Sequence, residues 1–151
     1  MAILDGKLFF AEDALVEDTG LIGDVIDTHT TSIKDVLFRG EPIWWVSLIT
    51  HAPTADPPAD AEFSFMMVGN STEDVNGSGR TRVLTSGEFS VGEVRAGAYW
   101  NAVMPLTNVS TPRYIGAVAD TAGDTFTGMR ATTYLTITPP SFGWEKIKDW
   151  R

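Results

Sequence analysis

The stretch Met129–Thr138 constrains the fold of this chain most, because its apolar and polar residues alternate with a period of two. The residues expected on one face are Met129, Ala131, Thr133, Leu135 and Ile137, and those on the other are Arg130, Thr132, Tyr134, Thr136 and Thr138. This alternation is typical of an antiparallel strand with one face on a core and the other half-exposed.

Other β-favouring segments occur along the whole chain. Ile43–Ile49 is a nearly continuous apolar run of strand length, and it predicts a strand buried on both faces. Leu4–Phe10 predicts a short strand or an anchoring arm. Further strands are expected at Asp24–Asp27, Glu62–Val68, Arg80–Thr85, Glu88–Val91, Tyr99–Met104 and Arg113–Ala119. Residues 11–20 alone have some helical character, for a turn or two at most.

Glycine and proline separate these segments, giving about eight short strands with turns every ~8–12 residues. The sequence therefore predicts a single all-β domain, residues 1–151, folded as an antiparallel β-sandwich or barrel. A jelly-roll-like sandwich fits the strand count, while the strand order stays open. We expect a possible N-terminal arm at 1–11, an exposed Pro-rich loop at 50–61, a polar loop free to move at Asn70–Gly79, and a C-terminal tail at 139–151.

Charge and composition exclude several classes of function. The chain has 151 residues, no cysteine and a formal net charge of −9. Residues 1–62 hold 12 acidic and 3 basic residues, whereas residues 63–151 hold 8 of each. The absence of cysteine excludes disulfides and thiolate metal sites. We expect no nucleic-acid partner, because there is no basic patch, and no membrane partner, because no apolar run approaches ~20 residues.

The residues that carry chemistry form no recognisable catalytic, cofactor-binding or metal-binding motif. His29 and His51 have no partner at a metal-ligand spacing, so we expect structural or solvated roles for them. No phosphate-binding loop or nucleophile elbow is present. The adjacent acidic pairs match no calcium loop, and weak ion binding at Asp120–Asp124 is the alternative to simple solvation. These pairs are Glu12/Asp13, Glu17/Asp18 and Glu73/Asp74.

Aromatic residues are the better candidates for contact with a partner. Trp44 and Trp45 are adjacent in a predicted strand and must point to opposite faces, so at most one can line an exposed groove. The tail after the last strand carries further aromatic residues, which must pack on the protein itself or on a partner. The candidate contact residues are Phe142, Trp144 and Trp150 in the tail, and Phe9 and Phe10 near the N-terminus.

A series of short matches, in the same order along residues 2–136, identifies a resemblance. The matching residues are Ile3-Leu4-Asp5, Gly40-Glu41-Pro42, Ile43–Ile49, Phe63–Ser71, Thr85-Ser86-Gly87, Gly97, Pro105, Arg113-Tyr114-Ile115 and Gly123–Gly128. In these positions the chain resembles the capsid cement (decoration) proteins of short-tailed bacteriophages, of the Bordetella-phage type. The Pro-rich segment 50–61 and the tail 139–151 depart from the pattern.

The resemblance implies a jelly-roll-like homotrimer on the outer capsid surface of the virion, bridging neighbouring phage major capsid proteins. It implies no catalytic residue and no cofactor. The cysteine-free chain suits folding in the bacterial host cytoplasm, and the acidic residues 1–62 are expected to face a basic patch of the shell. Two alternatives are a binding module for carbohydrate or host-surface attachment, suggested by 5 Trp and 3 Tyr, and a polysaccharide-cleaving enzyme.

Overall fold

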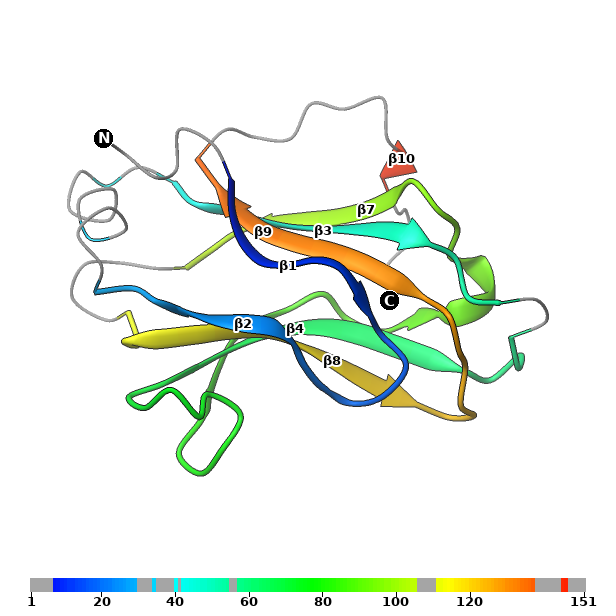
Figure 1. Ribbon diagram of the computed structural model, residues 1–151, viewed down its shortest axis with the longest axis horizontal. Helices are drawn as coiled ribbons and strands as arrows, with labels where there is room; N and C mark the ends of the chain where they lie inside the picture. Colours follow the sequence, from blue (N-terminus) through cyan, green and yellow to red (C-terminus); the bar gives the residue numbers. More distant parts are fainter. Residues whose placement is uncertain are drawn as a thin grey trace.

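The computed structural model describes residues 7–29, 34, 40, 42–54, 57–105, 111–137 and 145–146. These residues form a sandwich of two β-sheets (Figure 1). Sheet A has the strand order β1-β9-β3-β7-β10, and sheet B has the order β2-β8-β4-β5, with β6 paired to β4. The elements are β1 (Lys7–Leu15), β2 (Gly20–Asp27), β3 (Trp44–His51), β4 (Glu62–Asn70), β5 (Thr81–Thr85), β6 (Phe89–Ser90), the 3-10 turn η2 (Val91–Glu93), β7 (Ala98–Val103), β8 (Tyr114–Ala122), β9 (Arg130–Thr136) and β10 (Glu145–Lys146).

The strand pairing is nested. Each strand of the first half pairs antiparallel with its counterpart from the second half: β1 with β9, β2 with β8, β3 with β7, and β4 with β5. Successive pairs alternate between the two sheets, so the chain is one long hairpin wrapped around a core. This arrangement is a jelly roll. The predicted all-β, jelly-roll-like antiparallel sandwich is confirmed.

The core lies between the inner faces of the two sheets. Trp45 from β3 packs edge-on against Trp100 from β7, with ring centroids 4.8 Å apart, and against Phe65 from the opposite sheet at 6.5 Å. The predicted inner face of β4 is confirmed, because Phe63, Phe65 and Met67 are all 0% exposed. Aromatic edge-to-face contacts of this kind add to the stabilisation from apolar burial.

A small polar cluster lies inside this apolar core. The Thr133 hydroxyl accepts hydrogen bonds from Trp45 Nε1 at 2.7 Å and from Ser47 Oγ at 3.0 Å. All three residues are 0% exposed. A buried indole N–H needs an acceptor, and the alternation of β9 supplies it on the inner face.

The outer face of β9 is more buried than its alternation predicts. Tyr134 and Thr136 were expected to be half-exposed, yet they are 0% and 6% exposed. The register places Tyr134 in one row with Phe9 of β1 and Val46 of β3, and Tyr134, Val46 and Leu48 form a second, smaller apolar cluster. Because these three side chains come from three different strands, the apolar and polar pattern of one strand does not reveal that they pack together.

Residues 11–15 belong to strand β1, so the prediction of a helical turn across residues 11–20 is wrong. The strand is irregular: its register against β9 shifts on both sides of Ala11, and Asp13 has a left-handed φ of 51°. The Asp13 N–H donates to Thr132 Oγ1 of β9 at 2.9 Å. Cross-strand bonding therefore overrides local helical preference, and the bulges break the period-two pattern that would have revealed the strand.

The β4–β5 connection is more closed than its polar composition predicts. Asn70 is 7% exposed, and its side-chain amide donates to the carbonyl oxygens of Asp74 at 3.2 Å and Ser78 at 3.1 Å. Val75 is 0% exposed and packs on the outer face of sheet B. A single valine and a buried asparagine thus hold a segment that the sequence identified only as polar and free to move.

Two of the segments predicted to lie outside the sheets contribute strand residues: residues 7–11 of the predicted N-terminal arm belong to β1, and Glu145 and Lys146 of the predicted tail form β10. In the Pro-rich segment, Thr50 and His51 end β3, and the described residues between His51 and Glu62 form no strand. Across the part of the chain that the structure describes, no helix is long and apolar enough to span a membrane.

Candidate functional site

The structure separates the five aromatic contact candidates. Phe142, Trp144 and Trp150 lie outside the described residues. Phe9 is partly buried on the outer face of sheet A, with its ring centroid 5.4 Å from that of Tyr134. Phe10 is 1% exposed in the main core, so this residue cannot reach a partner in the folded chain. Phe9 and Phe10 point to opposite faces of β1, as adjacent strand residues do, and the tertiary structure decides that Phe10 is the one facing the core.

The described part of the C-terminal tail contacts the chain's own sheet. Glu145 and Lys146 form β10, which pairs in parallel with Ala98 and Tyr99 of β7. The tail is therefore attached at the β7 edge of sheet A.

His51 and Asp13 form an exposed cluster at the β1 bulge. His51 Nδ1 lies 3.0 Å from Asp13 Oδ1, and the Thr50 hydroxyl donates to the same carboxylate oxygen at 2.6 Å. The Thr50 hydrogen bond, followed by the charge and hydrogen bond of His51, holds the pKa of Asp13 below its usual value. Thr50 and Asp13 both approach the same ring nitrogen, Nδ1, so the group joins β1 to β3.

His29 is also at the surface, in a separate place. Its backbone N–H donates to Asp27 Oδ1 at 2.9 Å, and Arg113 Nη2 lies 3.3 Å from Asp27 Oδ2. The hydrogen bond from His29 and the interactions with Arg113 lower the pKa of Asp27. This group fastens the end of β2 to β8, and it is not brought together with His51.

The acidic residues do not gather as a metal site. Among the described residues, no group of three or more His, Cys, Asp or Glu side chains is placed to hold a metal ion. Asp60 and Asp124 are close together: a hydrogen bond and charge repulsion from the Asp60 carboxyl raise the pKa of Asp124. Asp124, in the segment that was the candidate for weak ion binding, therefore lies next to the carboxyl group of Asp60, and the two negative charges repel each other.

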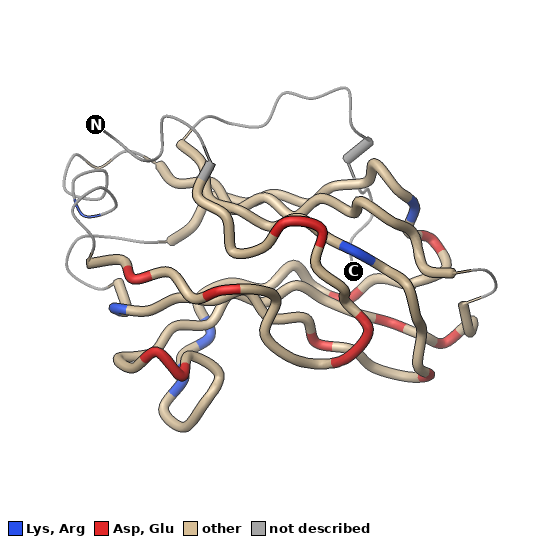
Figure 2. The backbone as a smooth tube through the Cα atoms, in the orientation of Figure 1, with Lys and Arg blue, Asp and Glu red and all other residues tan. Residues whose placement is uncertain are grey.

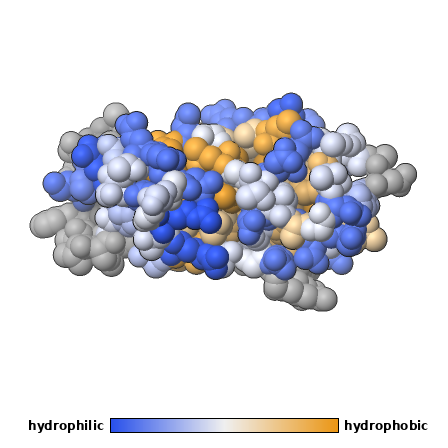
Figure 3. Space-filling model, turned by 90° about the horizontal axis from the view of Figure 1, so that it is seen from below, coloured by the Kyte–Doolittle hydropathy of each residue, from blue (hydrophilic) through white to orange (hydrophobic). Residues whose placement is uncertain are grey.

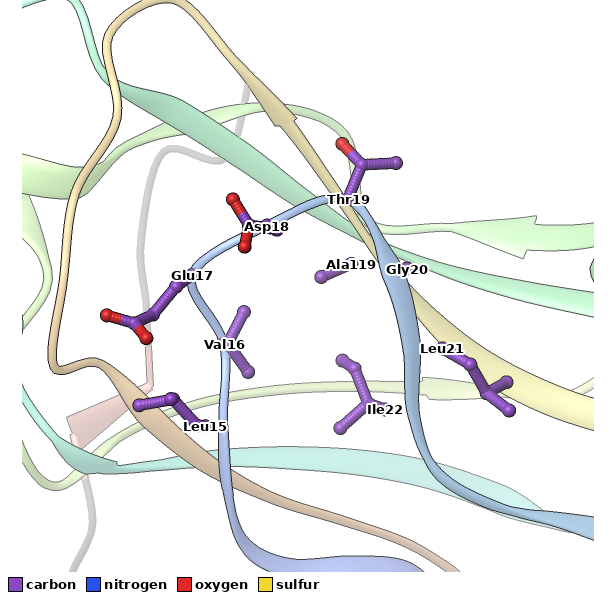
Figure 4. A pocket seen from close by; sticks show the side chains of 9 residues that line it. All are labelled: Leu15, Val16, Glu17, Asp18, Thr19, Gly20, Leu21, Ile22 and Ala119. Carbon is purple, nitrogen blue, oxygen red and sulfur yellow. The ribbon is translucent and has the colours of Figure 1, made fainter.

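A hollow of about 240 Å³ lies at the corner where β1 passes into β2 (Figure 4). Val16 and Ile22 point into the space between the two arms of the corner, and Ala119 of β8 closes it from behind. Leu15 and Leu21 flank the hollow on its outer sides, and are 50% and 42% exposed. Val16 and Ile22 are only 2% and 3% exposed, so the exposed apolar side chains at this corner are the two flanking leucines.

Hydrogen bonds to β8 and to the β8–β9 connection fix the polar residues of this corner. Glu17 Oε2 accepts the backbone N–H of Gly128 at 3.1 Å, and Thr19 Oγ1 accepts the backbone N–H of Thr121 at 3.0 Å. Asp18, between them, is exposed. The hydrogen bonds of Glu17 and Thr19 therefore fix the backbone of the corner, while the Asp18 carboxylate faces solvent.

The surroundings of the hollow are acidic. Figure 2 shows acidic segments collecting towards the lower right, where the corner and the β8–β9 connection lie. The basic residue opposite Leu15 in the register, Arg130, donates to the backbone carbonyl of Asp13 at 2.9 Å. The acidic residues of the corner and its neighbouring connections are Glu17, Asp18, Asp60, Asp120 and Asp124.

Leu21 also extends the apolar surface of sheet B. Its register partner is Val118, and the cluster on that face contains Val118, Met66 and Val68. Figure 3, seen from below, shows apolar residues in a band across this face with hydrophilic residues around it. Apolar surface and acidic surface therefore meet at the β1–β2 corner.

Sequence reasoning missed this corner. The Glu17/Asp18 pair was interpreted as solvated, inside a segment expected to be a short helical turn. Leu15 and Leu21 lie on either side of the two acidic residues in the sequence, and their spacing does not place them on one face of an amphipathic helix. This spacing was the signal against a helical turn. Comparison of the chain with models of known protein families, and with curated protein sequences, finds no match.

Proposed function

We propose that this chain is a structural virion protein: a capsid cement protein that binds the outer surface of a bacteriophage capsid as a homotrimer. There it bridges and stabilises neighbouring major capsid proteins. The protein is made in the bacterial cytoplasm, acts without a cofactor, and has no catalytic role.

The observation that supports this proposal best is the nested jelly-roll pairing. The resemblance to cement proteins implied a jelly-roll-like sandwich, and the strand order of the two sheets is of that kind. Because one fold serves many functions, the topology supports the proposal only together with the residues of the resemblance.

The physical properties of the sandwich suit a clamp on a shell. Trp45, Phe63 and Phe65 are fully buried, so the body has a closed, rigid core. A protein that binds only across assembled subunits stabilises the assembled state by mass action. The acidic chain, with a net charge of −9, is repelled by nucleic acid and attracted to basic protein surface.

Binding to shells tests the proposal directly. The purified chain is mixed with empty shells of the phage that encodes it, sedimented, and imaged by electron microscopy. We expect co-sedimentation and added density on the shell exterior at sites between capsid subunits. If no density appears on the shell exterior at a saturating concentration of the protein, the proposal is wrong.

Salt dependence and mass provide independent checks. Electrostatic docking predicts that the amount of bound protein falls as salt rises from about 50 to about 500 mM, because the screening length falls severalfold. Light scattering is expected to give about three times the monomer mass, in solution or after release from the shell. Binding that is insensitive to salt would exclude the electrostatic part of the proposal, and a monomer in both states would exclude the trimer.

A further inference from the structure

The outer face of sheet A is shielded from solvent, although every described strand belongs to one of the two sheets of the sandwich. Tyr134 of β9 and Val46 of β3 point away from the main core and are 0% exposed, and Leu48 beside them is 8% exposed. Sheet B packs on the opposite, inner face of sheet A, where Trp45 meets Phe65. The outer face therefore needs a cover from outside the described residues.

Two polar atoms on the same face are shielded as well. Trp44 of β3 and Asn101 of β7 are each next in sequence to a core tryptophan, so their side chains lie on the outer face. The indole nitrogen of Trp44 and the side-chain oxygen of Asn101 are buried, and neither has a hydrogen-bond partner among the described residues. Polar atoms on an open sheet face are hydrated, so this shielding also indicates a covered face.

The connection between β9 and β10 must pass from one corner of sheet A to the opposite corner. β9 ends at Thr136, which lies level with Trp44 and Val103 in the register. β10 begins at Glu145, which lies level with Ala98, the residue at the other end of β7 from Val103. Figure 1 shows β10 at the opposite end of the sheet from the point where β9 ends.

The length of this connection selects its route. Its ends lie about 16 Å apart along the strands and about 14 Å apart across the three strand spacings from β9 to β10, which gives a diagonal of about 22 Å. The nine Cα–Cα steps from Thr136 to Glu145 span at most about 30–32 Å. A path around the edge of the sheet needs about 30 Å before the reversal that brings β10 parallel to β7. Because the core fills the inner face, the diagonal across the outer face is the route that fits.

The exposure of the outer face follows this diagonal. Counted in strand spacings and residues, Val46 lies almost directly under it, and Tyr134 and Leu48 lie within about 5 Å of it. Val103 lies at a corner of the same face, about 7 Å to the side, and is 46% exposed. A narrow cover along the diagonal explains why three residues are buried while the fourth is open.

The amino acids of the connection suit such a crossing. Pro139 and Pro140 favour an extended polyproline conformation, and they have no backbone N–H that would need a partner in a sheet. Phe142 and Trp144 follow them and bring two large apolar side chains to the half of the path nearest β7 and β10. These side chains match the apolar surface beneath the diagonal.

We propose that residues 138–144 cross the outer face of sheet A of their own chain, and that Phe142 and Trp144 pack against Val46 and Leu48. The inference does not depend on the proposed function. It makes the outer face of sheet A an intramolecular docking surface, so this face is closed to other proteins.

The proposal also divides the candidate contact residues of the tail. Phe142 and Trp144 hold the tail on its own sheet, while Trp150 lies beyond β10 in the sequence and remains for contact with a shell or another partner.

Nuclear Overhauser contacts in the full chain test the proposal directly. In a sample with labelled methyl groups, Val46 and Leu48 should show contacts to the ring protons of Phe142 or Trp144. Contacts to a different segment in their place would overturn the proposal. A mixture of methyl-labelled and ring-labelled chains separates the two sources of such contacts: contacts between different copies would show that the segment is exchanged between subunits, and would overturn the intramolecular assignment.

Single cysteines measure the cover independently, because the chain has no cysteine of its own. Val46→Cys should react with a maleimide at least about tenfold more slowly than Val103→Cys, whose position is open to solvent. Ala117→Cys, in the core on β8, is the control for unfolding. If Val46→Cys reacts as fast as Val103→Cys, the outer face is open and the proposal is wrong.

Substitutions in the tail then identify the segment that covers the face. Phe142→Ser/Trp144→Ser should speed the labelling of Val46→Cys at least about tenfold and leave Ala117→Cys protected. Trp150→Ser is the matched control, because it removes a tail aromatic beyond β10, and it should leave both rates unchanged. Equal rates for Val46→Cys in the two backgrounds would show that another segment covers it, and would overturn the proposal. If both cysteines react faster, the variant is unfolding, and the contacts measured in the unsubstituted tail decide.

Discussion

Replacement of Thr133 by valine tests whether the polar cluster in the core contributes to the stability of the sandwich. Valine has nearly the shape of threonine, so packing against the surrounding strands is kept. It lacks the oxygen that accepts hydrogen bonds from Trp45 Nε1 at 2.7 Å and from Ser47 Oγ at 3.0 Å. Because all three residues are 0% exposed, water cannot replace the lost acceptor.

The expected loss follows from the two donors left without this acceptor. A buried polar group without a partner costs about 1–3 kcal/mol. The Ser47 hydroxyl can rotate towards another acceptor, whereas the Trp45 indole is held by its ring contacts, so we expect a loss of about 2–4 kcal/mol in the free energy of unfolding. For a domain of this size, that lowers Tm by on the order of 10 °C.

Urea unfolding followed by tryptophan fluorescence measures this loss, since Trp45 itself reports on the core. Thr133→Ser is the matched control: it keeps the hydroxyl and loses one methyl group, for about 1 kcal/mol. The m-value should stay constant, showing that the folded and unfolded states expose the same surface. A valine variant at least as stable as the serine variant would refute the argument that the hydroxyl is needed.

Other substitutions give three further predictions. Gly123→Ala should lower the free energy of unfolding by at least about 2 kcal/mol in chemical unfolding, because φ is +73° and the new Cβ would lie 1.9 Å from the Asp60 carbonyl oxygen. The control is Gly79→Ala, which should cost only about 1 kcal/mol, because φ is +83° but no atom lies nearer than 3.9 Å to the new Cβ. Asn70→Ala should speed amide hydrogen exchange throughout the β4–β5 connection and lower stability by about 1–2 kcal/mol, and unchanged exchange would contradict the role of Asn70. Because the folded-state pKa of Asp124 is raised, its contribution to stability is present below pH 3.8 and is lost as pH rises, so Asp124→Asn should raise Tm at about pH 7 and not at about pH 3.

The sequence predicted side-chain burial best in strands whose own apolar pattern shows which residues face the core. Ile43–Ile49 was expected to be buried on both faces, and Trp45 to Ile49 are all buried in β3. Phe63, Phe65 and Met67 were expected to share a face, and all point into the core. These predictions succeeded because a period-two or continuous apolar pattern is a local property.

The predictions failed where neighbouring strands determine the environment. Tyr134 is buried because Phe9 and Val46 lie on either side of it in the register, and none of these residues is close to another in the sequence. Residues 11–15 are a strand because β9 supplies hydrogen-bond partners to a bulged segment that looks irregular by itself. The hollow at the β1–β2 corner was missed for the same reason, since its lining comes from β1, β2 and β8, and a hydrogen bond from the connection after β8 holds Glu17 beside it.

The sequence by itself determined the class of the fold, most of its strand positions, the cysteine-free core and the excess of acid in residues 1–62. Those properties depend on composition and on patterns within one strand length. The tertiary structure alone decided the nested pairing, the inward turn of Phe10 and the meeting of apolar and acidic surface at the β1–β2 corner. Each of these brings together residues up to about a hundred positions apart, as Glu17 and Gly128 are, and only the closure of long-range strand pairs makes such residues neighbours.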